Sequence, residues 1–580
     1  MEIAAVLREF GDLLEIKGSN PFRIRAYRNA VRTINDLTRS LASMVEGGED
    51  LTELPGIGKE MANHIGELVE WGELSVLEAL GQEVPRSLTD LIRLDGVGPK
   101  KAKRLWEELG VTSVDDLEQA LEEDRVAGLA GFGAKSAEKI FRSIEDFRKH
   151  QGRFLLSEVD VLVRPLIRYL EEVGVVERVE VAGSYRRRKE TVGDIDLLVL
   201  SEDGHEQVMD SFQAYPGVVR VEAAGGSKGR VVLRSGLPVD LRIVPRDSFG
   251  AALHYFSGSK EHNVAIRTLG VKKGLKISEY GVFSESEAEA GDSGDNKVGG
   301  AEEADVFSAV GLPWINPLLR ENRGEVEAAR AGELPEALKT QDIRGDLQMH
   351  STWSDGANTL REMAEACRDR GYEYLSITDH SQAVTVAGGL KPPQVREQWE
   401  QVEEVRQLVG GIHLFRSLEV DILKDGSLDM PDEILAGLDL VLVSVHSFMN
   451  MPIAEMTKRV IRALEHPQVD ILAHPTGRIL NRREPFAMDV DAVLQAAAEL
   501  DVAVELNAHP SRLDLHDRHV RRAKELGVKV AINTDAHSVQ DLDLMRYGLD
   551  QGRRGWLESG DVLNAMSLGE FQVWKDRKNP

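Results

Sequence analysis

From about residue 340 onward, short hydrophobic, β-branched runs alternate with helical stretches, and this alternation constrains the fold more than any other feature. The runs include YEYLSIT, LDLVLVSVH, VDILAH, VAVELN and VKVAINT, and TLREMAEACRDRG is one of the helical stretches. Strands that alternate with helices form βα units, whose strands lie parallel in an open sheet or a barrel. The C-terminal part of the chain is therefore predicted to be a parallel α/β domain.

The first 150 or so residues have a different pattern, because a Gly-x-Gly turn recurs among helically spaced hydrophobic residues. It occurs in LPGIGKEMANHI, LDGVGPKKAKRL and LAGFGAKSAEKI, each time at the start of a predicted helix. Glycine allows a positive φ, and the first turn of a helix presents unpaired N–H groups that can bind phosphate. This region is predicted to be nearly all helical, with phosphate-binding turns at Gly56, Gly58, Gly96, Gly98, Gly131 and Gly133.

Between these two regions, from about residue 153, short strands predict a mixed α/β domain. VERVEVAGS, GDIDLLVLS, GRVVLRS and LPVDLRIVP are β-rich runs bounded by turn residues. Residues 284–305 contain eight acids, one lysine and no aromatic residue, which predicts a solvated surface loop. A chain of 580 residues is too long for one hydrophobic core, and its length alone predicts about four domains.

Composition limits the cofactors and the location of the protein. Cys367 is the only cysteine, so an internal disulfide and a thiolate zinc cage are excluded, and any metal needs His or carboxylate ligands. No hydrophobic run approaches the roughly 18 residues that a bilayer requires, which predicts a cytoplasmic protein without a membrane segment. The formal net charge of −27 argues at first against a nucleic-acid partner, so local features must provide any such contact.

Three aspartates on predicted strands form the first candidate site. Asp194 and Asp196 lie two residues apart in GDIDLLVL, which places both carboxylates on one face of a strand, and Asp240 lies in VDLRIV. Such a triad can hold two divalent cations about 4 Å apart for phosphoryl transfer. The preceding GSYRRR supplies a turn and guanidinium groups suited to a triphosphate. A solvated strand edge is the alternative interpretation of an isolated Asp-x-Asp pair.

Histidines form the second candidate site. Ten of the fifteen follow residue 340, and several stand near the ends of predicted strands, in GDLQMHSTWSDG, SITDHS, SVHS, LAHP and TDAHS. The C-terminal ends of the strands of a βα barrel meet at one mouth, so ligands distant in sequence can converge there. Imidazole and carboxylate suit manganese, zinc or iron. A surface or core position is the alternative for a single histidine, and we interpret His413, His466, His516 and His519 in that way.

The string from GSYRRR to VDLRIV resembles the nucleotidyltransferase palm of the family X DNA polymerases. YFSGSKEHNVAIR, at residues 255–267, is similar to the block that follows the palm in that family. The resemblance implies that Asp194, Asp196 and Asp240 are catalytic and hold two Mg²⁺ or Mn²⁺ ions. It also implies nucleotide contacts at Ser184, Arg187, Gly193, Tyr255, Phe256, Gly258, Ser259, Lys260, Asn263 and Arg267.

The glycine turns resemble the helix-hairpin-helix motifs of the same family, which bind the DNA backbone without reading sequence. Residues 1–82 resemble its N-terminal domain, which in polymerase beta carries a lyase that uses a Schiff-base lysine. The matching position here is His64, and because imidazole does not readily form an imine, lyase activity by this route is doubtful. The domain is expected instead to bind the downstream end of a gap through Arg23, Tyr27 and its glycine turn.

The histidine strings resemble the PHP (polymerase and histidinol phosphatase) family, whose distorted βα barrel binds up to three metal ions and hydrolyses phosphoesters. The family motif opens His-x-His, whereas this chain has Gln348 before His350, so one metal position is expected to be weak or differently coordinated. His509 is expected at the mouth. The resemblance implies two to three Mn²⁺ or Zn²⁺ ions, held by His350, Asp355, His380, Glu419, His446, His474, Asp535 and His537.

The order of these resemblances is that of the bacterial family X polymerases. The predicted fold is multidomain, with an all-α helix-hairpin-helix region, an α+β nucleotidyltransferase palm with a thumb, and a C-terminal distorted (β/α)7 PHP barrel. The predicted domains are a small N-terminal helical domain (1–82), fingers (83–152), palm (153–245), thumb with the acidic loop (246–335) and PHP domain (336–580).

The implied function is DNA-directed synthesis from dNTPs by a monomer. It would fill short gaps in gapped or primed DNA during base-excision repair or end joining, with a metal-dependent 3′–5′ exonuclease in the PHP domain. Two alternatives stay open: a barrel that acts as a histidinol-phosphatase-like small-molecule phosphatase, and a DNA-binding scaffold with an inactive barrel. Given the acidic net charge, DNA binding is expected to be weak without divalent metal and strongly dependent on salt.

Overall fold

The computed structural model describes residues 3–36, 41–46, 48–54, 56–71, 74–92, 94, 96–126, 128–129, 131–150, 152–284 and 296–577. Its contacts divide the chain into two compact units, which we describe separately. The first unit contains residues 1–180, 192–245 and 481–483, and the second contains residues 181–191, 246–480 and 484–580.

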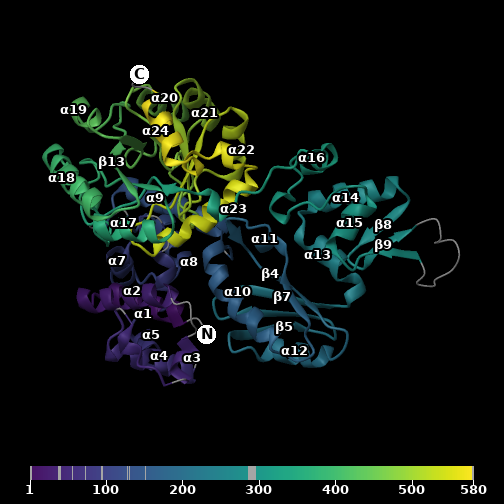
Figure 1. Ribbon diagram of the computed structural model, residues 1–580. Coiled ribbons are helices and arrows are strands. Elements are labelled where there is room, and N and C mark those ends of the chain that lie inside the picture. Colours follow the sequence, from purple (N-terminus) through teal and green to yellow (C-terminus); the bar gives the residue numbers. More distant parts are fainter. Residues whose placement is uncertain are drawn as a thin grey trace. The chain divides into compact units, whose positions relative to one another are not determined.

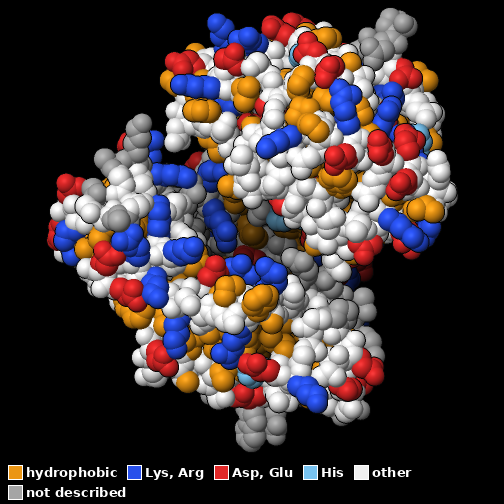
Figure 2. Space-filling model, turned by 90° about the vertical axis from the view of Figure 1, so that its left-hand side faces the viewer, with side chains coloured by type: hydrophobic (Ala, Val, Ile, Leu, Met, Phe, Trp, Pro, Cys, Tyr) orange, Lys and Arg blue, Asp and Glu red, His pale blue; other side chains and the backbone are white. Residues whose placement is uncertain are grey.

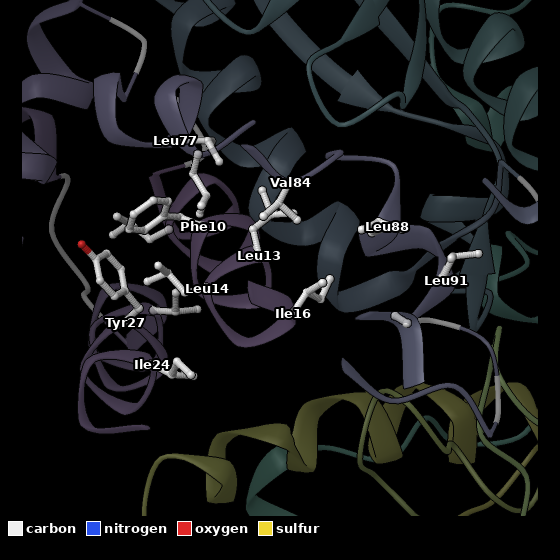
Figure 3. Close-up of a cluster of buried hydrophobic side chains, with 14 of the residues drawn as sticks. Phe10, Leu13, Leu14, Ile16, Ile24, Tyr27, Leu77, Val84, Leu88 and Leu91 are labelled. Carbon is white, nitrogen blue, oxygen red and sulfur yellow. The ribbon is translucent and has the colours of Figure 1, made fainter. Parts of the chain in front are cut away.

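The described part of residues 3–150 is helical, as predicted. In the first helix, Leu13 and Leu14 follow Phe10 by three and four residues, so all three lie on the same side of the helix, and they are buried with Leu77 in the cluster of Figure 3. This cluster forms part of the hydrophobic core of the N-terminal region. The helices are α1 (Ile3–Lys17), α2 (Pro21–Asp36), α3 (Leu41–Glu46), α4 (Lys59–Trp71), α5 (Ser75–Glu83), α6 (Leu88–Leu91), α7 (Pro99–Leu109), α8 (Val114–Glu122) and α9 (Ala134–His150).

The first glycine of each turn has the positive φ that the sequence suggested, whereas Gly58, Gly98 and Gly133 do not. Gly56, Gly96 and Gly131 have φ angles of 75°, 87° and 87°, in the left-handed region that favours glycine. Helices α4, α7 and α9 begin directly after the second glycine of each turn. The sequence repeat is therefore a structural repeat, and its phosphate-binding role stays a prediction.

The predicted palm contains a five-stranded sheet with the order β2-β4-β7-β6-β5. The four strands expected from the sequence are present, with β4 parallel to β7 and β7 antiparallel to β6. The remaining strand, β5, was not predicted, because it is an edge strand whose side chains are nearly all exposed and which therefore lacks the alternation of a half-buried strand. Helices α10 and α12 contact each other and lie beside this sheet in Figure 1. The bounds are β1 (Phe154–Leu155), α10 (Leu156–Glu171), β2 (Arg178–Val181), β3 (Thr191–Val192), β4 (Ile195–Leu200), α12 (His205–Ala214), β5 (Val218–Ala224), β6 (Lys228–Leu233) and β7 (Pro238–Val244).

In the second unit, the predicted thumb packs helices against a small antiparallel sheet with the order β10-β9-β8 (Figure 1). A hydrophobic cluster that includes Ile266, Val282 and Phe307 forms its core. A short helix, α11, lies earlier in this unit. The elements are α11 (Gly183–Arg186), α13 (Phe249–Ser257), α14 (Lys260–Lys272), β8 (Leu275–Ser278), β9 (Gly281–Ser284), β10 (Lys297–Gly299), α15 (Glu303–Ala309) and α16 (Glu325–Ala331).

The predicted acidic loop over residues 284–305 is wrong in its last part, and residues 285–295 lie outside the described residues. Lys297–Gly299 form β10, and Glu303 begins α15 with only 8% of its surface exposed. The Glu303 carboxylate binds both Arg186 and Arg320. Local charge counting failed because one of these partners lies more than a hundred residues earlier in the chain.

The C-terminal region is a barrel of seven parallel strands in sequential order from β11 to β17, as predicted. Its first and last strands approach each other beyond their ends, where the His350 N–H donates to the Ala536 carbonyl at 2.8 Å. Figure 1 shows helices around these strands. The elements are β11 (Gly345–Asp346), α17 (Leu360–Asp369), β12 (Tyr374–Ile377), α18 (Pro392–Leu408), β13 (His413–Asp421), α19 (Asp432–Leu435), β14 (Leu440–Ser444), α20 (Ile453–Leu464), β15 (Ile471–Leu472), α21 (Val490–Glu499), β16 (Ala503–Asn507), α22 (Asp517–Glu525), β17 (Val530–Asn533), α23 (Met545–Arg554) and α24 (Leu568–Asp576).

Acidic and basic side chains are interspersed over the face of the molecule in Figure 2. The excess of 98 acids over 71 bases therefore does not form one continuous acidic surface on that face. Among the described residues, no helix is both long and hydrophobic enough to cross a membrane.

Candidate functional sites

The predicted metal ligands of the barrel lie at the C-terminal ends of its strands. Glu419 is on β13, and His380, His446 and His474 follow β12, β14 and β15 within three residues. Asp535 and His537 follow β17, and His350 and Asp355 follow β11. Parallel strands direct these ends toward one mouth, so residues spread over nearly 190 positions converge.

Glu419 is at the centre of this group and is fully buried. Its Oε2 lies 3.5 Å from His350 Nε2 and 3.3 Å from His380 Nδ1, while its Oε1 lies 2.9 Å from His474 Nε2 and 3.5 Å from His446 Nε2. Burial alone would raise the pKa of Glu419, but the surrounding histidines outweigh burial and hold this pKa well below its usual range. An ionised carboxylate beside four imidazoles would be a suitable ligand for a divalent cation.

The potential ligand atoms form two groups that share His380. One group contains His350, Asp355, His380 and His537, the other contains His380, Glu419 and His446, and the atoms of each lie within 4.8 Å of one another. Buried polar atoms in this region, including Nδ1 of His350 and Oε2 of Glu419, have no hydrogen-bond partner among the described residues. Because buried polar atoms are normally paired, these orphaned atoms fit bound cations.

The backbone at two of the predicted ligands has unusual dihedral angles. His474 and Asp535 have positive φ angles of 26° and 55°, although neither is glycine. Such conformations cost roughly 1–3 kcal/mol and persist where the surrounding structure fixes them. Asp535 is held by a hydrogen bond with His350 at 3.1 Å and another from Asn507 at 3.0 Å.

Gln348 is buried but belongs to neither group of ligand atoms. With its amide nitrogen turned toward Glu505, it donates to Glu505 Oε2 at 2.9 Å. The same carboxylate accepts the His474 N–H at 2.7 Å and Asn533 Nδ2 at 2.8 Å. Burial raises the pKa of Glu505 well above its usual range. Gln348, which stands where the family motif has histidine, is thus hydrogen-bonded to Glu505.

Two residues that contact the predicted ligands were not predicted from the sequence motifs. Arg512 Nε lies 3.4 Å from Asp535 Oδ2, and Asp421 Oδ1 accepts the His446 N–H at 2.9 Å. The signal for Arg512 was present, because it lies three residues after His509 in HPSR at a predicted strand end. His509 itself is hydrogen-bonded to Ser511 Oγ at 2.8 Å, and burial lowers its pKa.

The three palm aspartates lie on or beside two paired strands of the first unit. Asp196 of β4 and Asp240 of β7 are register partners in the parallel pair, and Asp194 directly precedes β4. Burial raises the pKa of Asp240, and the charge of Asp194 adds to that increase. Arg230, which the sequence analysis missed, donates to Asp240 Oδ2 at 2.7 Å.

Within the described residues, the groups of ligand atoms closer than 4.8 Å lie in the barrel, and the palm aspartates do not form such a group. Mutual repulsion of the carboxylates and the bond from Arg230 to Asp240 both favour a larger distance between the three carboxylate groups. The strand register nevertheless fits the geometry expected for a pair of cation ligands on one edge.

Most of the predicted nucleotide-binding residues lie in the second unit, and Gly193 lies in the first. The rings of Tyr255 and Phe256 on α13 meet edge to face with centroids 5.1 Å apart. Asn263 Nδ2 donates to the Tyr255 carbonyl at 2.6 Å, which fixes the turn between α13 and α14. A side chain at Gly258 would collide with Asn263 Oδ1, at 2.4 Å, so this turn requires glycine.

The other predicted nucleotide-binding residues border the same turn or lie near α11. Ser259 caps α14 by accepting the His262 N–H at 3.1 Å, Lys260 begins that helix, and Arg267 Nε lies 3.4 Å from the Asn263 carbonyl. Ser184 is part of α11, and Arg187 directly follows it. These positions are compatible with the predicted roles, which stay predictions.

In the N-terminal region, Tyr27 and His64 are partners. Their rings stack with centroids 6.0 Å apart, and the Tyr27 hydroxyl is hydrogen-bonded to His64 Nδ1 at 2.9 Å. The Tyr27 ring is buried at the edge of the cluster in Figure 3, with its hydroxyl pointing away from the hydrophobic side chains. Arg23 pairs with Glu60 at 2.9 Å. A phosphate contact by Tyr27 would therefore share a hydroxyl that His64 already engages.

Five family models match consecutive parts of the chain. They are a helix-hairpin-helix domain at residues 1–74, a SAM-like helix-hairpin-helix tandem at 88–146, the DNA polymerase beta palm at 156–224, the DNA polymerase beta thumb at 252–321 and the PHP domain at 346–509.

Similarity to individual proteins supports the same arrangement. The chain is 39% identical over its full length to the "DNA polymerase/3'-5' exonuclease PolX" of Bacillus subtilis (strain 168), covering 99% of that protein. It is 28% identical to rat DNA polymerase lambda over 52% of each chain. It is also 29% identical to a "Probable phosphatase" of Thermoanaerobacter sp. (strain X514) over 40% of this chain and 94% of that protein.

The fold and these matches define a DNA polymerase with a polymerase-beta-type palm and thumb and a C-terminal PHP barrel. The chain belongs to the bacterial family X DNA polymerases that carry a C-terminal PHP domain. The polymerase and PHP domains imply the use of divalent metal ions.

Proposed function

We propose that this chain is a DNA-directed DNA polymerase that fills short gaps during DNA repair, and that its barrel removes nucleotides from 3′ ends. The proposal of DNA synthesis rests on the register of Asp196 with Asp240 on adjacent palm strands. Full-length identity of 39% to a protein named as a polymerase and 3′–5′ exonuclease supports both halves.

In the palm, Asp194 and Asp196 would hold both Mg²⁺ or Mn²⁺ ions, and Asp240 would hold the ion beside the primer 3′ hydroxyl. Divalent ions bound there supply charge neutralisation during in-line phosphoryl transfer. Asp240, which would lie beside the primer 3′ hydroxyl, would also help to accept the hydroxyl proton. Arg230 orients this carboxylate through its hydrogen bond.

The turn between α13 and α14 would select the nucleotide. Tyr255 and Phe256, with the backbone at Gly258 and Ser259, would limit acceptance of a 2′-hydroxyl, while Lys260 would add positive charge and Arg267 would face the template. Asn263 uses Nδ2 to hold the Tyr255 carbonyl, which leaves its buried Oδ1 without a partner among the described residues. That oxygen is a suitable acceptor for the edge of an incoming base. Ser184, Arg187 and Gly193 would contact the triphosphate.

In the barrel, the eight predicted ligands would hold two to three Mn²⁺ or Zn²⁺ ions, which supply Lewis-acid activation of water and phosphate. Orphaned buried atoms on His350, His380 and Glu419 support this assignment. Arg512 lies beside Asp535 with part of its side chain exposed, so it is placed to bind a phosphate oxygen of the terminal nucleotide. His509 would border the same phosphate.

The DNA partner would be bound mainly through its backbone. The three glycine turns present helix N-termini to phosphates, and Arg23 adds a cation near the first turn. We propose that the protein works as a cytoplasmic monomer on gapped or primed duplexes. His64 is buried and hydrogen-bonded to Tyr27, so the domain would bind DNA without acting as a lyase.

Two sets of variants test the assignment of two activities to two sites. Asp194→Asn with Asp196→Asn should abolish filling of a one-nucleotide gap while leaving degradation of a 3′-recessed oligonucleotide intact. His380→Ala should have the reverse effect. Asp210→Asn, an exposed acid on α12, is the matched control. Gap filling that survives the double substitution would refute the palm assignment.

A small-molecule phosphatase remains the second candidate for the barrel, because the phosphatase relative aligns over 94% of its own length. Hydrolysis of a small phosphomonoester and of a 3′-recessed oligonucleotide should be compared in the same preparation. We expect a preference for the oligonucleotide; preference for the phosphomonoester would contradict the exonuclease. The inactive-scaffold alternative requires that neither substrate is hydrolysed with Mn²⁺.

A further inference from the structure

One helix of the barrel, α23, is bonded to the segment that follows α11 and includes Arg187 and Arg188. Gln551 Nε2 donates to the Arg188 carbonyl at 2.8 Å, and Arg554 Nη1 donates to the Arg187 carbonyl at 2.7 Å. Asp550 Oδ2 accepts from Arg188 Nε at 2.7 Å. We infer that Gln551 and Arg554 are positioning residues for nucleotide binding in the synthetic reaction. Through them the PHP barrel holds the triphosphate-binding turn of the polymerase.

The side chain of Arg554 is held in a fixed position by buried contacts within the barrel. Only 4% of its surface is exposed, and its Nη2 donates to Asp517 Oδ2 at 2.6 Å. Asp517 begins α22 and also binds Arg323 at 2.9 Å and His516 at 3.0 Å. Buried ion pairs of this kind add little net stability, but they fix geometry when all partners are satisfied. The barrel therefore holds Arg554 in one orientation.

Glu321 links Arg554 to the side chain of Arg187. Arg187 Nε lies 3.0 Å from Glu321 Oε1, and Arg554 Nη1 lies 3.1 Å from the same oxygen. Arg187 Nη1 also donates to the Ser257 carbonyl, at 2.8 Å, at the end of α13. One carboxylate is thus shared by two guanidinium groups.

This sharing determines how strongly Glu321 competes with a bound triphosphate for the guanidinium group of Arg187. With Arg554 present, the negative charge of Glu321 is divided, so the Arg187 guanidinium can exchange its carboxylate contact for phosphate oxygens. Without Arg554, more of the negative charge of Glu321 would act on Arg187 and retain it, with Lys189 as the other nearby cation. The Arg187 carbonyl would also lose its donor, which would loosen the turn.

The inference rests on the proposed function, because it assumes that Arg187 binds the triphosphate. It goes beyond that function by giving the PHP barrel a part in synthesis that does not involve the barrel's predicted metal ligands. Loss of metal from the barrel and loss of the α23 contacts should therefore have different effects on gap filling.

Steady-state filling of a one-nucleotide gap, with the dNTP concentration varied, tests the inference in the full-length protein. Gln551→Met keeps the side-chain volume and removes one neutral hydrogen bond, and Arg554→Lys keeps the charge but not the forked geometry. Each should raise the KM for dNTP about 5- to 10-fold with less than a twofold change in kcat. Arg554→Ala should have a larger effect that Arg554→Lys partly rescues. Arg546→Ala, an exposed arginine on the same helix, is the control and should change neither constant.

Three additional measurements separate positioning from folding. Exonuclease activity should be unchanged in Gln551→Met and Arg554→Lys, and thermal unfolding should show that both variants stay folded at the assay temperature, although the lost buried bonds lower the midpoint. Glu321→Gln should suppress most of the KM increase caused by Arg554→Lys, because the competing carboxylate is then absent. If Arg554→Lys fails to fold, Gln551→Met alone decides the question.

The possible failures are distinguishable. If the unmodified protein does not fill gaps, the proposed function is wrong. If it fills gaps and Gln551→Met leaves the KM for dNTP unchanged, the inference is wrong and the proposed function stands. A parallel loss of kcat, exonuclease activity and thermal stability in Gln551→Met would also overturn the inference, since it would indicate a purely structural contact.

Discussion

Arg230 Nη1 donates to Asp240 Oδ2 at 2.7 Å across the antiparallel pair of β6 and β7. A guanidinium group thus binds one of the three carboxylates proposed to hold the palm cations. The ion pair with Arg230 and the binding of a divalent ion would both use the negative charge of Asp240, so Arg230 and the ion compete for this carboxylate. The ion pair also keeps the carboxylate oriented along the strand edge.

This competition predicts the effect of removing Arg230. Arg230→Met should lower the Mg²⁺ concentration that gives half-maximal gap filling about fivefold, because a nearby unit charge is worth about 1 kcal/mol at a hydrated site. A Mg²⁺ titration of the gap-filling rate measures the effect. Arg178→Met, which removes an exposed arginine from β2, is the control. A higher Mg²⁺ requirement in Arg230→Met would show that orientation outweighs competition.

Asp421 supports His446 in the barrel. Its Oδ1 accepts the His446 N–H at 2.9 Å and lies 3.3 Å from His446 Nδ1. Residues that orient a metal-binding histidine typically contribute 10- to 100-fold to metal affinity or activity. Asp421→Asn should therefore reduce exonuclease activity by about 10- to 100-fold and leave gap filling unchanged. Asp425→Asn, in the following exposed turn, should affect neither, and an equal loss of both activities would contradict the assignment.

The parts that could be predicted from the sequence are those encoded by local patterns. Glu419 and the histidines after β12, β14 and β15 stand at strand ends, and parallel strands bring such ends together whatever the details of packing. The glycine turns were recognisable for the same reason, since a positive φ is a local requirement of the backbone.

Contacts between distant segments were not predictable in this way. Arg554 and Arg187 are 367 residues apart, and no periodicity or motif connects them. Glu303 was assigned to an acidic loop because its partner Arg186 lies 117 positions away. Such contacts depend on how elements pack, which a local pattern does not specify.

Glu303 should make the stability of the thumb depend on pH. Burial tends to raise its pKa, but hydrogen bonding and charge from Arg320 and Arg186 outweigh burial and hold the pKa well below the ordinary 4.5. A carboxylate with a depressed pKa stabilises the fold above about pH 4.5, and this contribution is lost as the pH falls below that value. Hydrogen-exchange protection of α13 and α15 should therefore decline between pH 5 and 3, by about 2 kcal/mol or more.

The variant Glu303→Gln tests this assignment. Because it leaves the buried Arg320 and the partly exposed Arg186 without their charged partner, it should lower the opening free energy of these helices by about 3 kcal/mol at pH 7 and remove most of the pH dependence. Glu327→Gln, an exposed position on α16, is the control. A pH dependence that persists in Glu303→Gln would assign the effect to another group.

The presence of glutamine at position 348 leads to a prediction about the number of metal ions that the barrel binds. The two groups of ligand atoms share His380 and do not include Gln348, whose amide instead binds Glu505. A neutral amide contributes little to the binding of a borderline metal, so any third ion next to this position should be bound weakly.

Gln348→His should increase the metal bound per chain by up to one ion, and elemental analysis after dialysis measures this directly. Gln348→Glu supplies a charged ligand of similar length, and it should also raise the metal content if an ion site is present beside Gln348. Unchanged metal content in both variants would show that the hydrogen bonds to Glu505, rather than the weakness of glutamine as a ligand, define this corner of the barrel.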